Sequence, residues 1–218
     1  MAAQTDFIRS AILDLILAGE LGPGDAIHEK EICERFQSSR TPFREAILQL
    51  EAMNVVERRP RLGAYVKYPP FRELVERVEM HAELEGSMAA LAARRANRQQ
   101  ALELKQLVKD YQVAAESVNR GENPDIYNLN LKLHDQIFLA SGNRSMHAQI
   151  QLSGLILVGF FRARHSVISH IRKSAVEHQQ MVEAVLDADV SRARDITYRH
   201  VVMDAEELLD VANILASR

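Results

Sequence analysis

The 218-residue sequence contains a single cysteine, Cys33, so the chain cannot form an intramolecular disulfide. Proteins of reducing compartments rarely carry disulfides, and Cys33 is expected to be a small core residue. The N-terminus lacks the continuous apolar run of a secretory leader. The longest apolar stretch, around Leu152–Phe161, is shorter than the roughly 18 residues that a membrane span requires. We therefore expect a cytoplasmic protein without membrane association.

Sequence signatures of several enzyme classes are also missing. The chain has no His-Glu-x-x-His motif, no Gly-x-Ser-x-Gly motif and no glycine-rich phosphate-binding loop. The run Gly22-Pro23-Gly24 indicates a turn rather than a phosphate cradle. We therefore expect the chain not to be an enzyme. The formal net charge of −3 shows that the whole protein is not a polycation, so any binding of nucleic acid must come from a local patch.

Such a local patch lies between residues 35 and 67. Seven lysines and arginines oppose three acids there, a balance of +4. The basic residues are Arg35, Arg40, Arg44, Arg58, Arg59, Arg61 and Lys67. A clustered excess of positive charge, more than the overall pI, is the electrostatic footprint of a nucleic-acid-binding surface.

The centre of the patch is the stretch Gln37–Leu50, in which a helix is predicted after Gln37 and Ser38. Ser39 or Thr41 can cap its N-terminus, because a hydroxyl oxygen can accept a backbone N–H that has no partner in the first turn. Pro42 is tolerated in that first turn. Apolar residues then recur at helical spacing, at Phe43, Ala46, Ile47 and Leu50.

Arg40 and Arg44 lie one turn apart at the leading end of this helix. A helix that enters a major groove end-first presents side chains at this position to bases and phosphates. The alternative is a capped surface helix with two solvated arginines. The neighbouring sequence favours the first interpretation, because a short helix over 28–36 precedes it after only two residues, as in a helix-turn-helix.

Two short strands are predicted after this helix pair, over 55–59 and 64–67, with turn residues Pro60–Gly63 between them. An amphipathic helix over 7–16 is predicted before the pair. Together these elements form a winged helix-turn-helix with a basic wing. Pro69 and Pro70 can join neither a strand ladder nor a helix interior, so we place a domain boundary there, between residues 1–68 and 71–218.

The second domain is predicted to be helical throughout. Its apolar periodicity and breaks indicate helices over about 71–98, 101–120, 125–140, 145–165 and 169–187, and a last helix that reaches nearly to Arg218. The fold class is therefore mainly α, with an N-terminal winged helix-turn-helix and a C-terminal all-α bundle of about six helices.

Several motifs resemble a known family. The first half carries Gly19–Gly24, Glu29, Ser39–Ile47, Leu50, Pro60, Gly63 and Val66, which is similar to the GntR family of bacterial transcription regulators. The second half carries Glu85, Ala89-Ala90, His134, Ala140–Asn143, Glu177-His178 and His200, which resembles the effector domain of the FadR subfamily, called FCD.

The resemblance implies a homodimeric regulator, more often a repressor, that binds a palindromic double-stranded DNA operator. It also implies a small effector, commonly an organic acid, that changes DNA affinity. The family's DNA-contact positions fall on Lys30, Ser39, Arg40, Thr41, Arg44 and Gly63. Arg40 and Arg44 would read bases, because a guanidinium can donate two bonds to guanine, and the others would hold phosphates.

The FCD resemblance also implies a divalent metal, zinc first, with nickel or manganese as alternatives, held by Asn130, His134, His178 and His200. Asn130 and His134 are four residues apart and share a helix face. Imidazoles from three helices that converge in a bundle are typical of an interior metal site. The alternative is a set of hydrogen-bonded core histidines. The family usually has an acid where this chain has Asn130, and an amide is a weaker ligand.

The expected effector contacts are His81 and Arg162. The family often has arginine at the position of His81, which could replace it only when protonated. Arg162 and Arg164 are other candidate anion partners, although a solvated surface face is the favoured interpretation for each. A second function remains open, in which a metal-dependent enzyme acts on a small acid through the three histidines.

Overall fold

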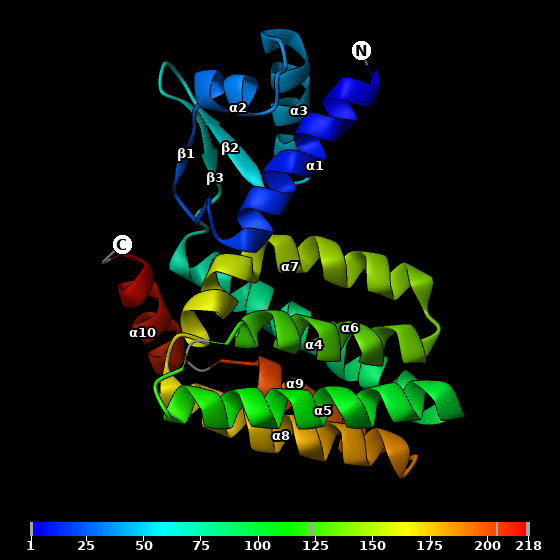
Figure 1. Ribbon diagram of the computed structural model, residues 1–218. Helices are drawn as coiled ribbons and strands as arrows, with labels where there is room; N and C mark the ends of the chain where they lie inside the picture. The colour runs from blue at the N-terminus through cyan, green and yellow to red at the C-terminus, as the bar shows by residue number, and fades with distance from the viewer. Residues whose placement is uncertain (1, 123, 204, 217–218) are drawn as a thin grey trace. The chain divides into compact units, whose positions relative to one another are not determined.

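The computed structural model describes residues 2–122, 124–203 and 205–216, and it is mainly helical with one small sheet (Figure 1). The chain forms two compact units, Met1–Glu73 with Leu152–Phe160, and Leu74–Gln151 with Phe161–Arg218. The predicted domain limits at residues 68 and 71 stay a prediction, because α7 (Arg144–Arg164) contributes to both units. Within the described ranges, no helix is long and apolar enough to cross a membrane.

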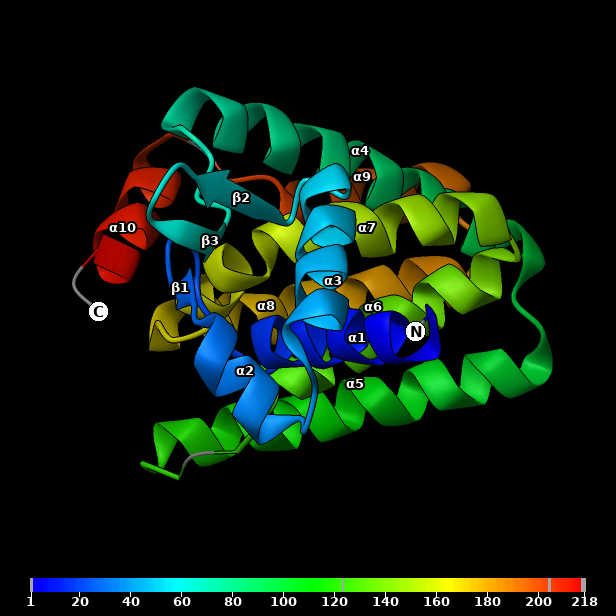
Figure 2. The same ribbon diagram turned by 90° about the horizontal axis from the view of Figure 1, so that it is seen from above.

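The first unit contains α1 (Ala2–Ala18), α2 (Glu29–Arg35) and α3 (Arg40–Ala52), besides its segment of α7. α1 packs against α3, and Figure 2 shows from above that the two helices cross. The contact buries apolar residues that recur at helical spacing, namely Ile8, Ile12, Leu15 and Ile16 of α1 and Phe43, Ala46, Ile47 and Leu50 of α3. The predicted inward face of α3 is therefore confirmed.

The turn between α2 and α3 differs from the prediction in one detail. Ser39 occupies the N-cap position with extended backbone, but its hydroxyl makes no capping hydrogen bond, and Thr41 lies inside the helix. Both side chains are exposed, so water can satisfy the first backbone N–H groups of α3. Cys33 is half-buried, and its thiol lies 3.6 Å from the carbonyl oxygen of Ser39, which links the end of α2 to the start of α3.

The sheet is antiparallel with the order β1-β3-β2, formed by β1 (Ala26–Ile27), β2 (Val56–Arg59) and β3 (Gly63–Val66). The hairpin β2–β3 was predicted, and Arg59 pairs with Gly63 at its closed end. Gly63 has a φ of 107°, a conformation that residues with a Cβ rarely adopt. β1 was not predicted, because two residues are too few to show a strand period.

The helical unit is formed by α4 (Phe71–Arg95), α5 (Arg98–Asn119), α6 (Ile126–Ser141), α7, α8 (Ile168–Leu186), α9 (Val190–Val201) and α10 (Ala205–Ala216). Two predicted boundaries were wrong. α4 ends at Arg95 because Asn97 starts a new helix, and the last helix is interrupted because Val202 has extended backbone. The predicted end near Arg218 lies outside the described residues.

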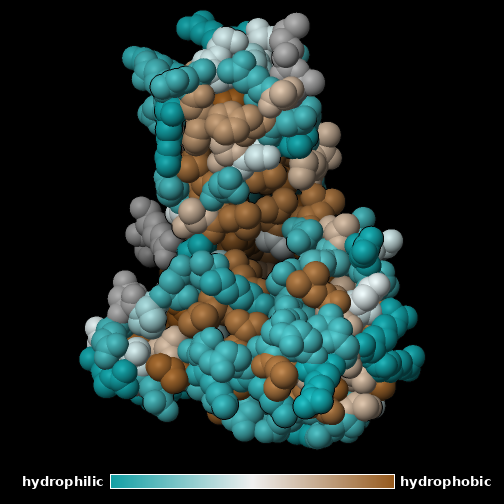
Figure 3. Space-filling view, turned by 45° about the vertical axis from the view of Figure 1, so that its right-hand side comes forward, coloured by the Kyte–Doolittle hydropathy of each residue, from teal (hydrophilic) through white to brown (hydrophobic). Residues whose placement is uncertain are grey.

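The core of the helical unit includes buried residues of α4, α5, α6, α7, α8 and α9. Its buried residues include Met88, Ala92, Leu104, Leu133, Ile137, Met181 and Val182. α5 packs against α6 and α8, and α8 packs against α9. The face of this unit seen in Figure 3 is mostly hydrophilic, with isolated hydrophobic side chains. The core therefore brings α6, α8 and α9 together, the three helices that carry His134, His178 and His200.

Candidate DNA-binding surface and metal centre

All six residues predicted to contact DNA are exposed, at Lys30, Ser39, Arg40, Thr41, Arg44 and Gly63. Lys30 lies in the first turn of α2, the next four lie at the start of α3, and Gly63 begins β3. The buried face of α3 fixes the helix on α1, so its opposite face and leading end are left for a partner.

Glu29 of α2 contacts both arginines of the predicted recognition helix. Its Oε1 lies 3.2 Å from Nε of Arg40, and its Oε2 accepts a hydrogen bond of 3.1 Å from Nε of Arg44. Glu29 is half-buried, whereas both arginine side chains are largely exposed. No role for Glu29 was predicted, because its pairing with the arginines depends on how α2 meets α3.

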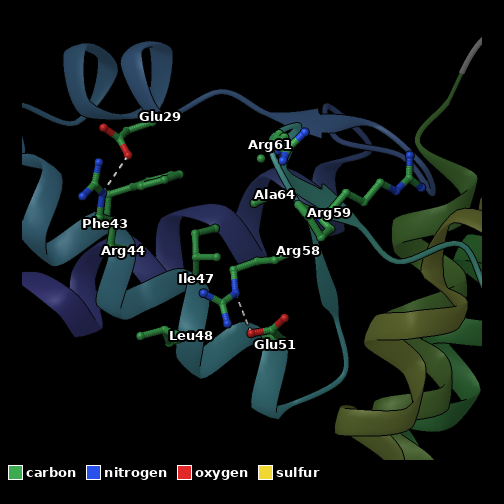
Figure 4. Close-up of a pocket in the computed structure, with 12 residues that line it drawn as sticks. Glu29, Phe43, Arg44, Ile47, Leu48, Glu51, Arg58, Arg59, Arg61 and Ala64 are labelled. Carbon is green, nitrogen blue, oxygen red and sulfur yellow. Dashed lines mark hydrogen bonds and ion pairs between the residues drawn. The ribbon is translucent and has the colours of Figure 1, made fainter.

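A surface hollow of about 660 Å³ lies between α3 and the wing (Figure 4). Glu29, Arg44 and Glu51 contribute from the helices, and the arginines Arg58, Arg59 and Arg61 contribute from the wing. Nε of Arg58 donates to Glu51 at 2.7 Å, and the guanidinium of Arg59 stacks on Tyr65. The basic wing predicted from the sequence is thus present beside the recognition helix.

The predicted histidines meet inside the helical unit. Nε2 of His134 lies 3.2 Å from Nε2 of His178 and 3.3 Å from Nε2 of His200, and the latter two are 3.1 Å apart. All three side chains are buried. Three nitrogens bound at about 2.0–2.1 Å to one ion lie roughly 3.0 Å apart in octahedral and 3.4 Å apart in tetrahedral geometry. The observed triangle therefore has the size of a metal site.

Two carboxylates orient this triangle. Nδ1–H of His134 donates to Glu85 at 2.6 Å, and Nδ1–H of His200 donates to Glu177 at 2.8 Å. A neutral imidazole that donates through Nδ1 presents the lone pair of Nε2. The two lone pairs therefore face one another across 3.3 Å, an arrangement that a cation between them stabilises. Carboxylates behind histidine ligands are typical of metal centres.

Electrostatics favour neutral imidazoles at His178 and His200. Burial, together with the neighbouring histidines, holds the pKa of His178 well below its usual value. Burial also lowers the pKa of His200 to about 4, against the opposing effect of Glu177. Burial alone would raise the pKa of Glu85, but His134 and His81 lower it below its usual range. At neutral pH His178 and His200 therefore offer nitrogen lone pairs, and the carboxyl group of Glu85 is ionised.

Asn130 is buried one turn before His134, and its Oδ1 has no hydrogen-bond partner in the described part of the chain. A buried oxygen without a partner costs free energy, and a cation would satisfy it. The donor set of three imidazoles and one amide oxygen fits zinc, nickel or manganese. Asn130 thus fits the predicted ligand role, which stays a prediction.

The predicted effector contacts have different surroundings. His81 is buried, and its Nε2 lies 2.9 Å from Oε1 of Glu85, so His81 and His134 share one carboxylate. Arg162 is half-buried with its guanidinium 4.4 Å from the ring centroid of Tyr127. The surface alternative was wrong for Arg164, which is buried and donates to Glu207 and to the carbonyl oxygen of His200, both at 2.8 Å.

Comparison with known families identifies a domain in each half of the chain. The family described as bacterial regulatory proteins, gntR family, matches residues 4–66, and the FCD domain matches residues 76–203. The chain belongs to the GntR family. It is thus a transcription regulator of the GntR type with an FCD domain, and the enzyme alternative loses its support because the matched relatives are regulators.

Two relatives illustrate the range of GntR-family similarity. The chain is 25% identical to the "Probable D-xylose utilization operon transcriptional repressor" of Paenarthrobacter nicotinovorans over 194 residues. This match covers 89% of this chain and 84% of that protein. It is 28% identical over 114 residues to the HTH-type transcriptional repressor RspR of Escherichia coli. This match covers 52% of this chain and 49% of that protein. Both relatives carry the name of repressor.

Solved structures share the fold. McbR/YncC of E. coli superposes with a TM-score of 0.76 at 22% identity and covers 100% of this chain and 99% of that chain. A GntR regulator from Rhodococcus sp. RHA1 gives a TM-score of 0.68 at 15% identity, with 99% of each chain covered. The winged helix-turn-helix and the helical FCD domain predicted from the sequence are therefore confirmed as the GntR architecture.

Proposed function

We propose that this GntR regulator is a repressor that binds a palindromic operator as a homodimer in the cytoplasm, and that a small organic acid bound in the FCD domain changes its DNA affinity. The observation that carries the DNA half is the pair Arg40 and Arg44, exposed at the leading end of α3 beside the arginines of the wing. The repressor names of two relatives support the sign of control.

Each predicted contact has a distinct task. Arg40 and Arg44 would donate hydrogen bonds to guanine in the major groove. Lys30, Ser39 and Thr41 would hold phosphates and so set the register of α3, while Gly63 allows the wing backbone to approach the duplex closely. A dimer places two such helices in half-sites about one helical turn apart, so a change in their spacing weakens binding.

The effector half depends on the buried histidines. Asn130, His134, His178 and His200 would hold a divalent metal, which supplies a Lewis-acidic point for a carboxylate when bound. Glu85 and Glu177 keep the imidazoles oriented, and His81 and Arg162 would contact the effector. The effector regulates only if it binds the DNA-competent and DNA-incompetent conformations with different affinities.

The DNA hypothesis can be tested with the chain itself. A duplex is first selected by the wild-type protein from a randomised library, and its affinity is measured by fluorescence anisotropy. The double variant Arg40→Ala, Arg44→Ala should lose the selected duplex, because each lost base contact costs about 1–3 kcal/mol.

Arg98→Ala is the matched control, since it removes an exposed arginine from the start of α5. This variant should bind as the wild type does, and circular dichroism should show unchanged helix content in all variants. Retained affinity of the double variant for the selected duplex would contradict the proposal. Small carboxylates can then be screened for a change in the wild-type affinity.

A further inference from the structure

Glu29 is placed to control how Arg40 and Arg44 meet a partner. The carboxylate uses one oxygen for each arginine, and both shortest approaches involve Nε, at 3.2 and 3.1 Å. In the part of the chain that the structure describes, the Nη1 and Nη2 groups of these two arginines form no hydrogen bond. Glu29 thus holds the inner edge of each guanidinium and leaves the outer edge exposed.

The edge that remains exposed matters for base recognition. A guanidinium can address the O6 and N7 atoms of guanine through Nη1 and Nη2, or through Nε and one Nη group. The hydrogen bond to Glu29 occupies Nε of Arg44, and Oε1 of Glu29 lies 3.2 Å from Nε of Arg40, so this arrangement favours the end-on mode for both arginines. Because Glu29 orients the side chains of Arg40 and Arg44 in the free protein, these side chains lose less rotamer freedom when DNA binds.

The charge of Glu29 has a second effect. Two guanidinium groups one helical turn apart repel each other, and a carboxylate between them relieves this repulsion. The three groups together carry one positive charge instead of two, which weakens attraction to the phosphates of any duplex. The affinity for the specific sequence therefore rises relative to the affinity for other sequences.

We propose that Glu29 is a specificity-determining positioning residue, which aligns Arg40 and Arg44 for end-on reading of guanine and suppresses binding to DNA of other sequences. This inference rests on the proposed DNA-binding function. It assigns to the first residue of α2 a role in base discrimination that does not require Glu29 to touch DNA.

The test measures discrimination rather than affinity alone. The probes are the duplex selected by the wild-type protein, versions in which each G·C pair is replaced in turn by A·T, and a scrambled duplex. Glu29→Gln should reduce the discrimination at the guanines read by the arginines by roughly tenfold or more. It should also bind the scrambled duplex more tightly and with a steeper salt dependence, because a negative charge is lost.

Two further variants separate geometry from charge. Glu31→Gln removes the same charge from an exposed position of α2 and should keep the discrimination of the wild type. Glu29→Asp keeps the charge but is one methylene shorter, so it cannot reach both arginines. It should bind the scrambled duplex as the wild type does and still lose discrimination.

The inference is overturned if Glu29→Gln discriminates between duplexes as well as the wild type does. It is also overturned if Glu31→Gln loses as much discrimination as Glu29→Gln, or if Glu29→Asp discriminates as well as the wild type. These failures differ from failure of the proposed function, in which the wild-type protein selects no sequence from the library at all. Retained binding of the scrambled duplex shows that each variant is folded.

Discussion

Glu85 contacts two buried imidazoles, those of His81 and His134, so one carboxylate orients both rings in the helical unit. Its two oxygens lie 2.9 Å from Nε2 of His81 and 2.6 Å from Nδ1 of His134. A substitution of His81 therefore alters the hydrogen bonding of His134, because both imidazoles contact the carboxylate of Glu85. Arginine at the position of His81 would bring a permanent charge to this carboxylate, whereas histidine can remain neutral.

His165 determines part of the pH dependence of stability. It is buried, and burial lowers its pKa to about 3. The unfolded chain takes up a proton below about pH 6.5 while the folded chain does not, so each such histidine removes about 1.4 kcal/mol of stability per pH unit until the folded pKa is reached. Above about pH 6.5 both states are neutral and the effect vanishes.

We therefore expect His165→Phe to be less sensitive to acid than the wild type. The carbonyl of Phe161 keeps its bond from the backbone N–H of residue 165, and the buried Nε2, which lacks a partner among the described residues, is removed. Between about pH 7 and pH 5, urea unfolding should show a loss of stability smaller by about 2 kcal/mol. His28→Phe, which replaces an exposed imidazole, should follow the wild type. Equal acid sensitivity of His165→Phe would show that His165 is not the cause.

At the scale of single elements, the start of α5 shows how a short polar signal determines the position at which a helix begins. Oδ1 of Asn97 accepts from the backbone N–H of Gln100 at 2.9 Å, and Oε1 of Gln100 accepts from the backbone N–H of Asn97 at 3.0 Å. This reciprocal pair is a capping box. It explains why α4 and α5 are separate helices.

Asn97→Ala should lower the free energy of unfolding by about 1 kcal/mol, because the first turn of α5 then lacks its cap. Gln99→Ala is the matched control in the same turn, where only an exposed bond to Glu103 is lost. Its effect should stay within about 0.5 kcal/mol. Denaturant unfolding measures both variants, and equal effects would argue against a stabilising cap.

At the scale of the whole molecule, the histidine centre joins three helices far apart in the sequence. His134 lies on α6, His178 on α8 and His200 on α9. Arg164 adds a link, because it donates to the carbonyl oxygen of His200 and to Glu207 of α10. A ligand of the histidines would thus stabilise the packing of most of the helical unit.

We expect protein purified without chelator or metal-affinity tag to contain near-stoichiometric metal, and removal by chelation to lower its stability. A metal at about 100 times its Kd stabilises the folded state by about 2.7 kcal/mol. His134→Ala should lose both the metal, by elemental analysis, and the stabilisation, by thermal unfolding. Asn130→Asp should bind metal more tightly, because a carboxylate replaces an amide oxygen.

His147→Ala is the control for this measurement. His147 is half-buried and pairs with Asp135 at 2.7 Å, and it is not among the three clustered histidines. Its replacement should leave the metal content unchanged. Absence of metal from the wild type, even after addition of zinc, nickel or manganese, would show that Asn130 disables the site and that the effector is bound by hydrogen bonds and cationic side chains.

The sequence by itself determined the parts of this protein that depend on local pattern. Helical periodicity and the first-turn proline are enough for α3, and turn residues between β-forming segments are enough for the wing, because these signals act within a few residues. The resemblance to the GntR family and its FCD domain predicted the three histidines as metal ligands and the positions that contact DNA. It could not show how any of these side chains are held.

Only the tertiary structure decided the partners of these residues. Glu85 and His134 are 49 positions apart in the chain, and His134 and His200 are 66 apart, so their meeting depends on helix packing and leaves no local periodicity. The same holds for Glu29 with Arg44 and for the burial of Arg164. Local propensity determines elements, whereas hydrogen bonds between elements form only after the core has brought them together.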